Sequence, residues 1–238
     1  MKVSIIMPVY NTPTEWLVAS IKSILNQTHH DFEFIIINDA STSIEVSKVI
    51  LDFKKIDNRI HLIELHDNCG LPACLNLGIE YASSNLIFRM DSDDISYPER
   101  IQKQLDFLDK NPEVDVLGAA MNYTAQINSE WGVSTRIISK PYIVNKEYAV
   151  KNHFLLIHPT VVFKKDKIQK IGGYNKNLRG LPEDFDLWVR CLQSNYIIRN
   201  LQEPVLTYRV NDKGLSNNFN SEASEFIHML QKQIINLP

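Results

Sequence analysis

Residues 34–42 read Phe34-Ile35-Ile36-Ile37-Asn38-Asp39-Ala40-Ser41-Thr42 and join a short apolar run to a polar turn. Such a continuous run is typical of a strand covered on both faces, as in a parallel sheet. Similar runs occur at residues 3–7, 60–65 and 86–90. Apolar residues at helical spacing lie between them, which indicates βαβ units and a doubly wound α/β sheet.

The expected helix starts fit capping boxes, in which a Ser or Thr and a Glu three residues later cap each other's backbone N–H groups. The pairs are Thr12 with Glu15, Thr42 with Glu45, and Ser96 with Glu99. They place the loops after the first, second and fourth strands at one edge of the sheet, where such folds bind ligands. We therefore expect Tyr10, Asn11, Asp39 and the aspartates after residue 90 to share one crevice.

These aspartates form the segment Met90-Asp91-Ser92-Asp93-Asp94 at the end of the fourth apolar run. Side chains alternate along a strand, so Asp91 and Asp93 point the same way and repel each other unless a cation lies between them. Mg²⁺ or Mn²⁺ carrying phosphates suits oxygen ligands of this kind. The alternative is a solvated turn, because Asp and Ser are common turn residues.

The composition describes an ordinary soluble globular protein. The chain has 238 residues, of which 44% are apolar and 22% charged, with a formal charge of −3 that gives no electrostatic reason to expect nucleic acid as a partner. The N-terminal apolar run is too short for a signal peptide, and no run reaches the roughly 18 residues of a membrane span. We therefore expect a cytoplasmic protein, with Cys69, Cys74 and Cys191 as reduced thiols.

The second half of the chain is less regular. Its patterns predict strands at residues 114–119 and 160–163, a polar hairpin or excursion at 126–140, an amphipathic helix at 183–194, an edge strand at 205–210 and a final helix at 221–235. No linker rich in Gly or Pro divides it into domains. The final helix has an apolar side and so packs against some surface, which the sequence alone does not identify.

Six motifs follow one another along residues 3 to about 210. They comprise Val3-Ser4-Ile5-Ile6-Met7-Pro8-Val9-Tyr10-Asn11, Ser23-Ile24-Leu25-Asn26-Gln27, residues 34–42, residues 68–78, residues 90–94 and Pro182-Glu183-Asp184-Phe185-Asp186-Leu187-Trp188. In order and spacing they resemble the motifs of the family 2 glycosyltransferases, nucleotide-sugar-dependent enzymes with the GT-A fold.

The resemblance implies a GT-A three-layer α/β sandwich with a mainly parallel sheet. Residues 1–210 would form one domain, with a nucleotide-sugar-binding half (1–110) and an acceptor-binding half (111–210); residues 211–238 would be a polar loop and a helical tail. The implied activity is inverting, metal-dependent transfer from a nucleotide sugar, with UDP-sugar favoured, to a saccharide or lipid-linked saccharide. The expected pathway is synthesis of a capsule, O-antigen or lipopolysaccharide. Oligomeric state and association with the inner face of the membrane stay open.

The resemblance also implies roles for the residues of the nucleotide site. Tyr10 would stack on the base, Asp39 would accept a hydrogen bond from a base N–H, which favours uracil, and Asn68 and Gly70 would lie along the nucleotide. The remaining residues expected to contact the nucleotide sugar are Pro8, Asn11, Asp91 and Ser92. Surface packing is the alternative for Tyr10, and an Asx turn is the alternative for Asp39.

In the metal and catalytic sites, Asp93 would be the main ligand of Mn²⁺ or Mg²⁺, while Asp91 would bind ribose or reach the metal through water. Asp184 would be the catalytic base, with Glu183 supporting it or touching the acceptor. Two further candidates are His158, as a metal ligand or a structural histidine, and Trp188, as a core residue or a border of the acceptor pocket.

Three other functions share parts of this pattern. A sugar-nucleotide nucleotidyltransferase has a similar core, but the chain lacks a Gly- and Arg-rich phosphate loop after Pro8. A receiver-like signalling domain has an acidic Mg²⁺ pocket, but it is about half as long and has no use for Glu183 and Asp184. A non-catalytic sugar-binding domain would not require Asp91, Asp93 and Asp184, all of which are present.

Overall fold

The computed structural model describes residues 2–127, 130–133, 137–210 and 220–235. The strands are β1 (Val3–Val9), β2 (Phe32–Asn38), β3 (Ile60–Glu64), β4 (Leu86–Arg89), β5 (Ile95–Ser96), β6 (Val116–Ile127), β7 (Glu130–Val133), β8 (Ile143–Val144), β9 (Val162–Lys164) and β10 (Ile198–Arg209). The helices are α1 (Thr14–Leu25), α2 (Ile44–Ile56), α3 (Leu71–Tyr81), α4 (Arg100–Lys110), α5 (Lys146–Lys151), η1 (His158–Thr160, a 3₁₀ turn), α6 (Lys165–Lys170), α7 (Glu183–Gln193) and α8 (Ser221–Ile235).

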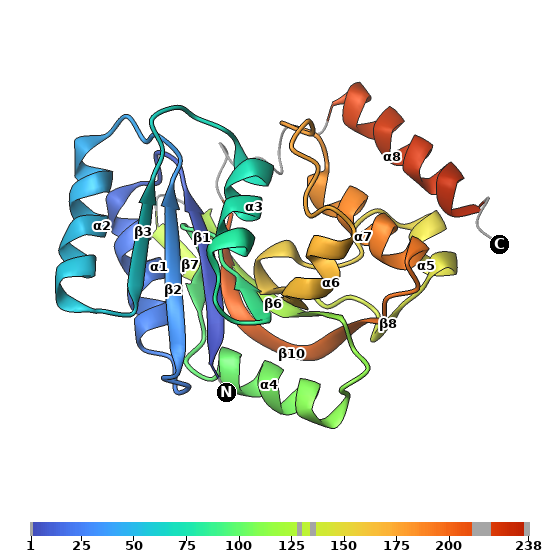
Figure 1. Cartoon of the computed structure of the whole chain (residues 1–238), viewed down its shortest axis with the longest axis horizontal. Helices are drawn as coiled ribbons and strands as arrows, with labels where there is room; N and C mark the ends of the chain where they lie inside the picture. The colour runs from blue at the N-terminus through green and yellow to red at the C-terminus, as the bar shows by residue number, and fades with distance from the viewer. Residues whose placement is uncertain (1, 128–129, 134–136, 211–219, 236–238) are drawn as a thin grey trace.

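The strands form one sheet in the order β3-β2-β1-β4-β9-β6-β10-β5, while β7 pairs with β6 and β8 pairs with β10. β1 is parallel to β2 and β4, β2 to β3, and β6 to β10; β9 is antiparallel to both its neighbours. Helices cover both faces of this sheet (Figure 1). The predicted α/β sandwich with a mainly parallel sheet and a C-terminal helix is confirmed.

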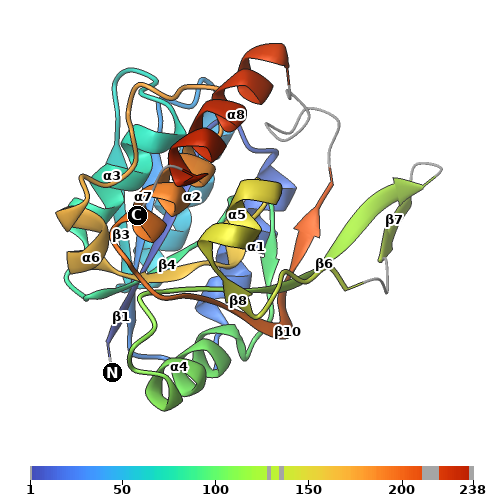
Figure 2. The same ribbon diagram turned by 90° about the vertical axis from the view of Figure 1, so that its right-hand side faces the viewer.

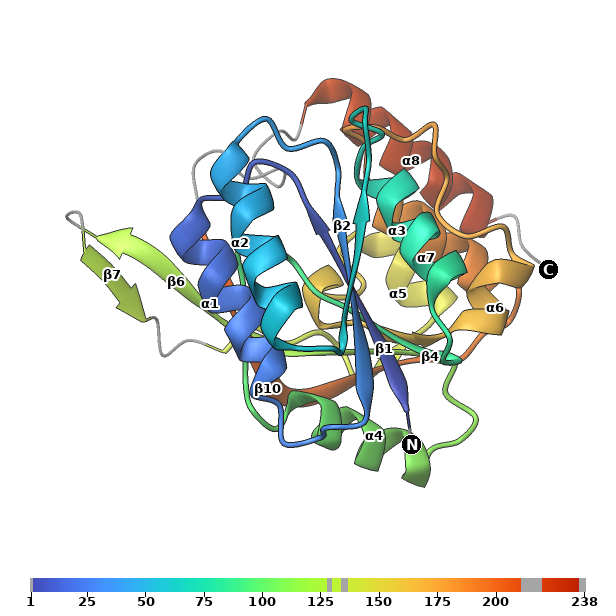
Figure 3. The ribbon, with the colours of Figure 1, turned by 60° about the vertical axis from the view of Figure 1, so that its left-hand side comes forward.

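The apolar run in β2 is explained by cores on both faces of the sheet. Phe34 and Ile36 pack with residues of α1, α2 and α4, whereas Ile35 and Ile37 pack with residues of α3 and α7. Successive strand residues point to opposite faces, so both sets must be apolar. Figure 3 shows α1 and α2 in front of the sheet and α3 beyond it.

Helix α3 lies very close to the sheet at Gly78. A Cβ atom there would come within 2.9 Å of Ile6 Cγ2 and 3.2 Å of Ile37 Cδ1. Glycine is otherwise unfavourable inside a helix. The close packing that it permits fixes the height of α3 above the strands and of the loop before it.

The three predicted capping boxes are wrong. The N-caps of α1, α2 and α4 are Pro13, Ser43 and Glu99, and none makes a side-chain capping hydrogen bond. The hydroxyls of Thr12 and Thr42 instead bond across to neighbouring loops. These side chains therefore stabilise contacts between loops rather than helix ends.

The strand predicted at residues 205–210 is present, but the prediction that it lies at the edge of the sheet is wrong. It belongs to the longer strand β10, which lies between β6 and β5, with register shifts on both sides of Pro204. Residues 160–163 divide into the end of η1 and the start of β9. Strands β6 and β7 form a hairpin that projects from the body of the molecule (Figure 2). It pairs residues 124–127 with 130–133 and so begins before the predicted hairpin at 126–140, of which residues 128–129 and 134–136 lie outside the described part of the chain.

Helix α8 packs against the chain's own α5 and α7. Its buried residues Ile227, Leu230 and Ile234 belong to the same apolar cluster as Leu187 and Trp188 of α7. The tail predicted from sequence thus supports the helix that begins at Glu183. Among the described helices, none is long and apolar enough to cross a membrane.

Candidate functional site

Hydrogen bonds tie together the loops that follow β1, β2 and β4 at the carboxyl edge of the sheet. The backbone N–H of Thr42 donates to Asn11 Oδ1 at 2.8 Å, and the hydroxyls of Thr12 and Ser92 lie 2.6 Å apart. Ser20 of α1 donates to the carbonyl of Asp91 at 2.9 Å. The structure thus brings the nucleotide-binding candidates and the acidic segment to one edge of the sheet.

Asp39 organises the loop before α3. Its carboxylate accepts hydrogen bonds from the backbone N–H groups of Cys69 and Gly70, at 2.7 and 2.9 Å, and from Asn68 Nδ2 at 2.9 Å. Asp39 is 3% exposed, and its buried carboxylate holds the backbone of the loop at residues 68–70 in place. Binding of a base N–H remains a prediction for the lone pairs that these contacts leave free.

Arg179 fastens the same loop from the segment before α7. Its Nη2 donates to the carbonyl and to the side-chain oxygen of Asn68, at 3.1 and 2.5 Å. Gly70 has φ +84°, and a Cβ atom there would meet Arg179 Nε at 2.9 Å. A glycine is therefore needed both for the left-handed backbone and for the close approach of the guanidinium.

The other nucleotide-site candidates lie at the end of β1. Tyr10 is 52% exposed, which leaves its ring open to a stacking partner. Asn11 has φ +50°, an uncommon backbone conformation for a non-glycine residue, and its side chain holds Thr42. Pro8 lies in β1 opposite Ile37. Their contacts with a nucleotide remain predictions.

Asp91, Asp93 and Asp94 form an acidic cluster, with one carboxylate oxygen from each lying within 4.8 Å of the others. Asp94 is fully buried, and its Oδ1 accepts the backbone N–H of Arg209 at 2.8 Å. Asp94 Oδ2 is buried with no hydrogen-bond partner among the described residues. Arg209 Nε donates to the carbonyl of Asp93 at 2.8 Å, which fastens the cluster to β10.

Burial and mutual repulsion make ionisation of this cluster unfavourable. Burial, with added repulsion from Asp91, raises the pKa of Asp93 to about 6, and the same two causes together with Asp93 raise the pKa of Asp94 well above its usual value. Arg89 offsets part of the charge through a two-pronged ion pair with Asp91, at 2.5 and 2.6 Å. Arg89 is itself buried, and Asp91 holds its pKa up.

The donor set fits a divalent cation. Three carboxylates converge, and the orphaned Asp94 Oδ2 lacks the partner that a buried carboxylate oxygen requires. Hard oxygen donors suit Mg²⁺ and Mn²⁺. Within the described residues His158 does not join this group; it lies beside Tyr174 and Glu183 instead.

The second acidic pair, Glu183 and Asp184, opens helix α7. Burial, with repulsion from Asp184, raises the pKa of Glu183 to about 8. Burial also raises the pKa of Asp184, although the Phe185 N–H donates to its Oδ1 at 2.8 Å and favours the ionised form. The charge of Arg89 lowers the pKa of both carboxyls. The buried guanidinium of Arg89 therefore favours the ionised form of both acidic groups.

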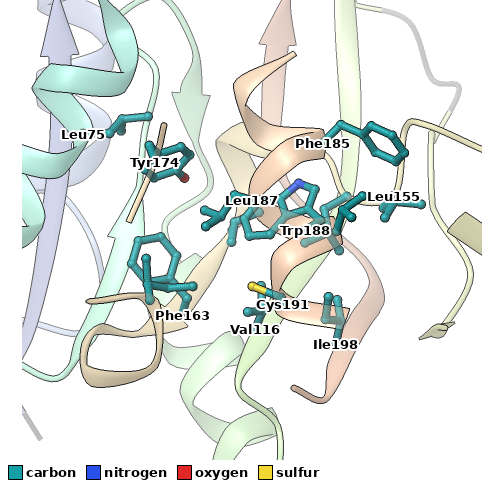
Figure 4. Close-up of a cluster of buried hydrophobic side chains, with 14 of the residues drawn as sticks. Leu75, Val116, Leu155, Phe163, Tyr174, Phe185, Leu187, Trp188, Cys191 and Ile198 are labelled. Carbon is teal, nitrogen blue, oxygen red and sulfur yellow. The ribbon is translucent and has the colours of Figure 1, made fainter. Parts of the chain in front are cut away.

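The side chains beneath this pair form a close-packed cluster. Trp188 is fully buried, as the core interpretation predicted, and its ring meets that of His158 edge-on at 6.0 Å. Tyr174 lies in the same cluster (Figure 4), and its hydroxyl is 2.9 Å from His158 Nε2.

Sequence reasoning missed both Tyr174 and Arg179. The pair Gly172-Gly173, with φ of +87° and +68°, marks a tight turn that could have drawn attention to Tyr174. Nothing in the pattern around Arg179 marks it, because its role depends on a contact more than a hundred residues away.

Comparison with known proteins places the chain among glycosyltransferases. Residues 4–172 match the family model for glycosyl transferase family 2. The chain is 35% identical over 215 residues to the O-antigen biosynthesis glycosyltransferase WbnJ of Escherichia coli, covering 89% of this chain and 80% of WbnJ. It is 32% identical over 210 residues to the E. coli UDP-Gal:alpha-D-GlcNAc-diphosphoundecaprenol beta-1,3-galactosyltransferase, covering 87% of this chain and 74% of that protein.

Solved structures agree on the fold. S. aureus TarS 1–349 in complex with UDP-GlcNAc superposes with a TM-score of 0.77 at 20% identity, covering all of this chain and 67% of that one. The chain spans 42% of a longer TarS structure, with a TM-score of 0.72. The GT-A fold is thus confirmed, and the glycosyltransferase assignment displaces the nucleotidyltransferase and receiver-like alternatives. The chain belongs to glycosyl transferase family 2.

Proposed function

We propose that the protein is an inverting, metal-dependent glycosyltransferase that moves a sugar from a UDP-sugar to an acceptor hydroxyl. The observation that carries the proposal is the pairing of two acidic groups around Arg89: the cluster of Asp91, Asp93 and Asp94, and the carboxyl of Asp184. The first suits a diphosphate with its cation, and the second suits proton removal.

The donor would lie along the carboxyl edge of the sheet. Tyr10 offers an exposed ring to the base, and the loop of Asn68 and Gly70, held by Asp39 and Arg179, provides a preformed surface for the nucleotide. A preformed loop does not lose conformational entropy when the ligand binds. UDP is the favoured nucleotide because Asp39 can accept the N–H of uracil.

Asp93 and Asp91 would hold the cation, together with oxygens of the donor diphosphate. When bound, Mn²⁺ or Mg²⁺ supplies positive charge that stabilises the departing diphosphate. The chain contributes its own cation as well, because Arg209 bonds to the acidic loop through Nε and the backbone N–H.

Asp184 would act as the base. One of its carboxylate oxygens takes the acceptor hydroxyl proton while the acceptor oxygen forms a bond to the anomeric carbon. The bond from that carbon to the diphosphate oxygen breaks, and the nucleoside diphosphate leaves with the electron pair. A single displacement inverts the anomeric centre, so an α-linked donor gives a β-linked product.

Relatives named for O-antigen and amylovoran biosynthesis support a role in cell-surface polysaccharide synthesis, with a saccharide or lipid-linked saccharide as acceptor. We place this activity in the cytoplasm, and a lipid-linked acceptor would bring it to the inner face of the membrane.

A panel of UDP-galactose, UDP-glucose, UDP-N-acetylglucosamine and GDP-mannose tests the proposal. Release of nucleoside diphosphate is measured with Mn²⁺, with Mg²⁺ and with EDTA, and nucleotide binding is followed by calorimetry. We expect turnover of at least one UDP-sugar that EDTA abolishes. Equal rates with metal and with EDTA would show that the transfer does not depend on a metal ion. Binding of no nucleotide would overturn the donor assignment.

A further inference from the structure

Tyr174 and His158 form a buried pair next to Glu183. The Tyr174 hydroxyl lies 2.9 Å from His158 Nε2, and His158 Nδ1 lies 3.7 Å from Glu183 Oε1. Tyr174 is 1% exposed, and the His158 side chain is 10% exposed. The three side chains therefore run in sequence from the core to the first residue of α7, beside the proposed base.

The surrounding structure fixes this pair in place. The Asn76 side chain of α3 accepts the backbone N–H of Tyr174 at 2.8 Å and donates to its carbonyl at 2.7 Å. Trp188 of α7 meets the His158 ring at 85°. Gly173 adjoins Asn76 so closely that a Cβ atom would clash with its Oδ1. These contacts hold the backbone of Tyr174 and the ring of His158 in place.

Both members of the pair are neutral. Burial lowers the pKa of His158 well below its usual value, and it raises that of Tyr174 well above. A neutral imidazole has a single N–H, so one ring nitrogen donates and the other accepts. Glu183 thus faces an uncharged partner that gives its ionised form no counter-charge, and burial raises its pKa to about 8.

The other charged groups around Glu183 do not supply that counter-charge in full. Asp184 on α7 and Asp91 after β4 repel a negative Glu183, while Arg89 on β4 attracts it. The guanidinium of Arg89 already makes a two-pronged ion pair with Asp91. The Glu183 carboxyl receives only its own backbone N–H among the hydrogen bonds that lower its pKa, whereas Asp184 receives both its own and that of Phe185. Of the two neighbouring carboxyls, Asp184 is better stabilised as an anion.

We propose that Tyr174 and His158 are positioning residues that hold Glu183 as the protonated member of the Glu183–Asp184 pair, so that Asp184 is the ionised one. The inference rests on the proposed role of Asp184 as base. Its consequence is that a second negative charge is kept away from the base, which would otherwise hold its own proton more tightly.

Tyr174→Phe tests this with the loss of one hydroxyl. The readout is the pH profile, from pH 5 to 9, of UDP release from whichever UDP-sugar is turned over fastest, with saturating Mn²⁺. In the proposed arrangement His158 Nε2–H donates to the Tyr174 hydroxyl, so the Nδ1 lone pair faces Glu183 and disfavours its ionised form. Without the hydroxyl, His158 can carry its proton on Nδ1, toward Glu183, and Glu183 then ionises more readily. We expect the acidic limb of the pH profile to move to higher pH by at least half a unit. At pH values below this limb the rate should fall threefold or more, while the KM for the donor stays within twofold of wild type.

Three further variants make the result decisive. Tyr196→Phe removes a hydroxyl that bonds to the Lys167 carbonyl, and it should leave the profile unchanged. In a Glu183→Gln background, which cannot ionise, Tyr174→Phe should cause no shift. His158→Gln should shift the profile in the same direction as Tyr174→Phe. Thermal unfolding of every variant identifies any that fail to fold.

A Tyr174→Phe profile that superposes on wild type would overturn the proposal, as would a shift that persists in the Glu183→Gln background. Asp184→Asn separates this from failure of the proposed function. If that variant is inactive while Tyr174→Phe is silent, only the positioning role fails; if it retains wild-type turnover, the base assignment itself fails.

Discussion

Glu183 should make the stability of the metal-free protein fall as pH rises through neutrality. Burial and the neighbouring Asp184 raise its pKa from 4.5 to about 8 in the folded state. Between these values the folded chain binds one proton more than the unfolded chain, so each rise of one pH unit lowers the free energy of unfolding by about 1.4 kcal/mol. The stabilisation is complete below the unfolded pKa and is lost as pH rises through 8. Since the loss levels off near the folded pKa, the fall from pH 6 to pH 8 is about 2 kcal/mol.

Glu183→Gln isolates this contribution because every other titrating group is retained. Urea unfolding in EDTA, followed by tryptophan fluorescence at pH 6, 7 and 8, gives the free energy of unfolding of each protein. The stability of wild type relative to Glu183→Gln should fall by about 2 kcal/mol over this range. Glu80→Gln, at an exposed position on α3, is the matched control and should parallel wild type. A wild-type minus Glu183→Gln difference that does not vary with pH would refute a buried, protonated Glu183.

Three further predictions concern the acidic cluster, the nucleotide loop and the core. Asp93→Ala should weaken Mn²⁺-dependent UDP binding, measured by calorimetry, by on the order of tenfold or more, because even residues that only orient metal ligands have effects of that size. The control variant Asp52→Asn, on the exposed face of α2, should bind UDP as wild type does. Arg179→Ala should weaken UDP binding about fivefold, the equivalent of about 1 kcal/mol for the lost bonds to Asn68, while Lys176→Ala in the same segment should have no effect. Gly78→Ala should lower the free energy of unfolding by about 1–3 kcal/mol, since its methyl group would press on Ile6; unchanged urea denaturation would contradict the close packing.

The parts of the fold that could be predicted are those encoded locally. The run Phe34–Ile37 signals a strand with two covered faces because each side chain meets a different core. Strand β10 could not be recognised in full, because Gln202, Glu203 and Pro204 interrupt its apolar pattern where the register shifts. Its place between β6 and β5 depends on partners distant in sequence.

The predictions of capping boxes were wrong for a similar reason. A threonine hydroxyl before a helix can cap that helix or bond to a neighbouring loop, and only the assembled structure decides which contact is made. Thr12 bonds to Ser92, eighty residues away. The structural use of Asp39 likewise depends on the loop at residues 68–70, which a single strand-end motif does not reveal.

The acidic segment and the Glu183-Asp184 pair could be singled out because both belong to the motifs in register that resemble family 2 glycosyltransferases. Their common dependence on Arg89, and the support of Glu183 by His158 and Tyr174, emerge only from three-dimensional contacts. Sequence thus indicated which groups are candidates, and the structure shows how they are held.

The central claim is that Asp184 takes the acceptor proton in a metal-dependent transfer from a UDP-sugar. The most direct test is the turnover of Asp184→Asn, measured beside its UDP affinity with Mn²⁺. We predict that kcat falls on the order of a thousandfold, within the range for loss of a general base, while the Kd for UDP stays within threefold of wild type. An Asp184→Asn enzyme that keeps wild-type kcat would contradict the account.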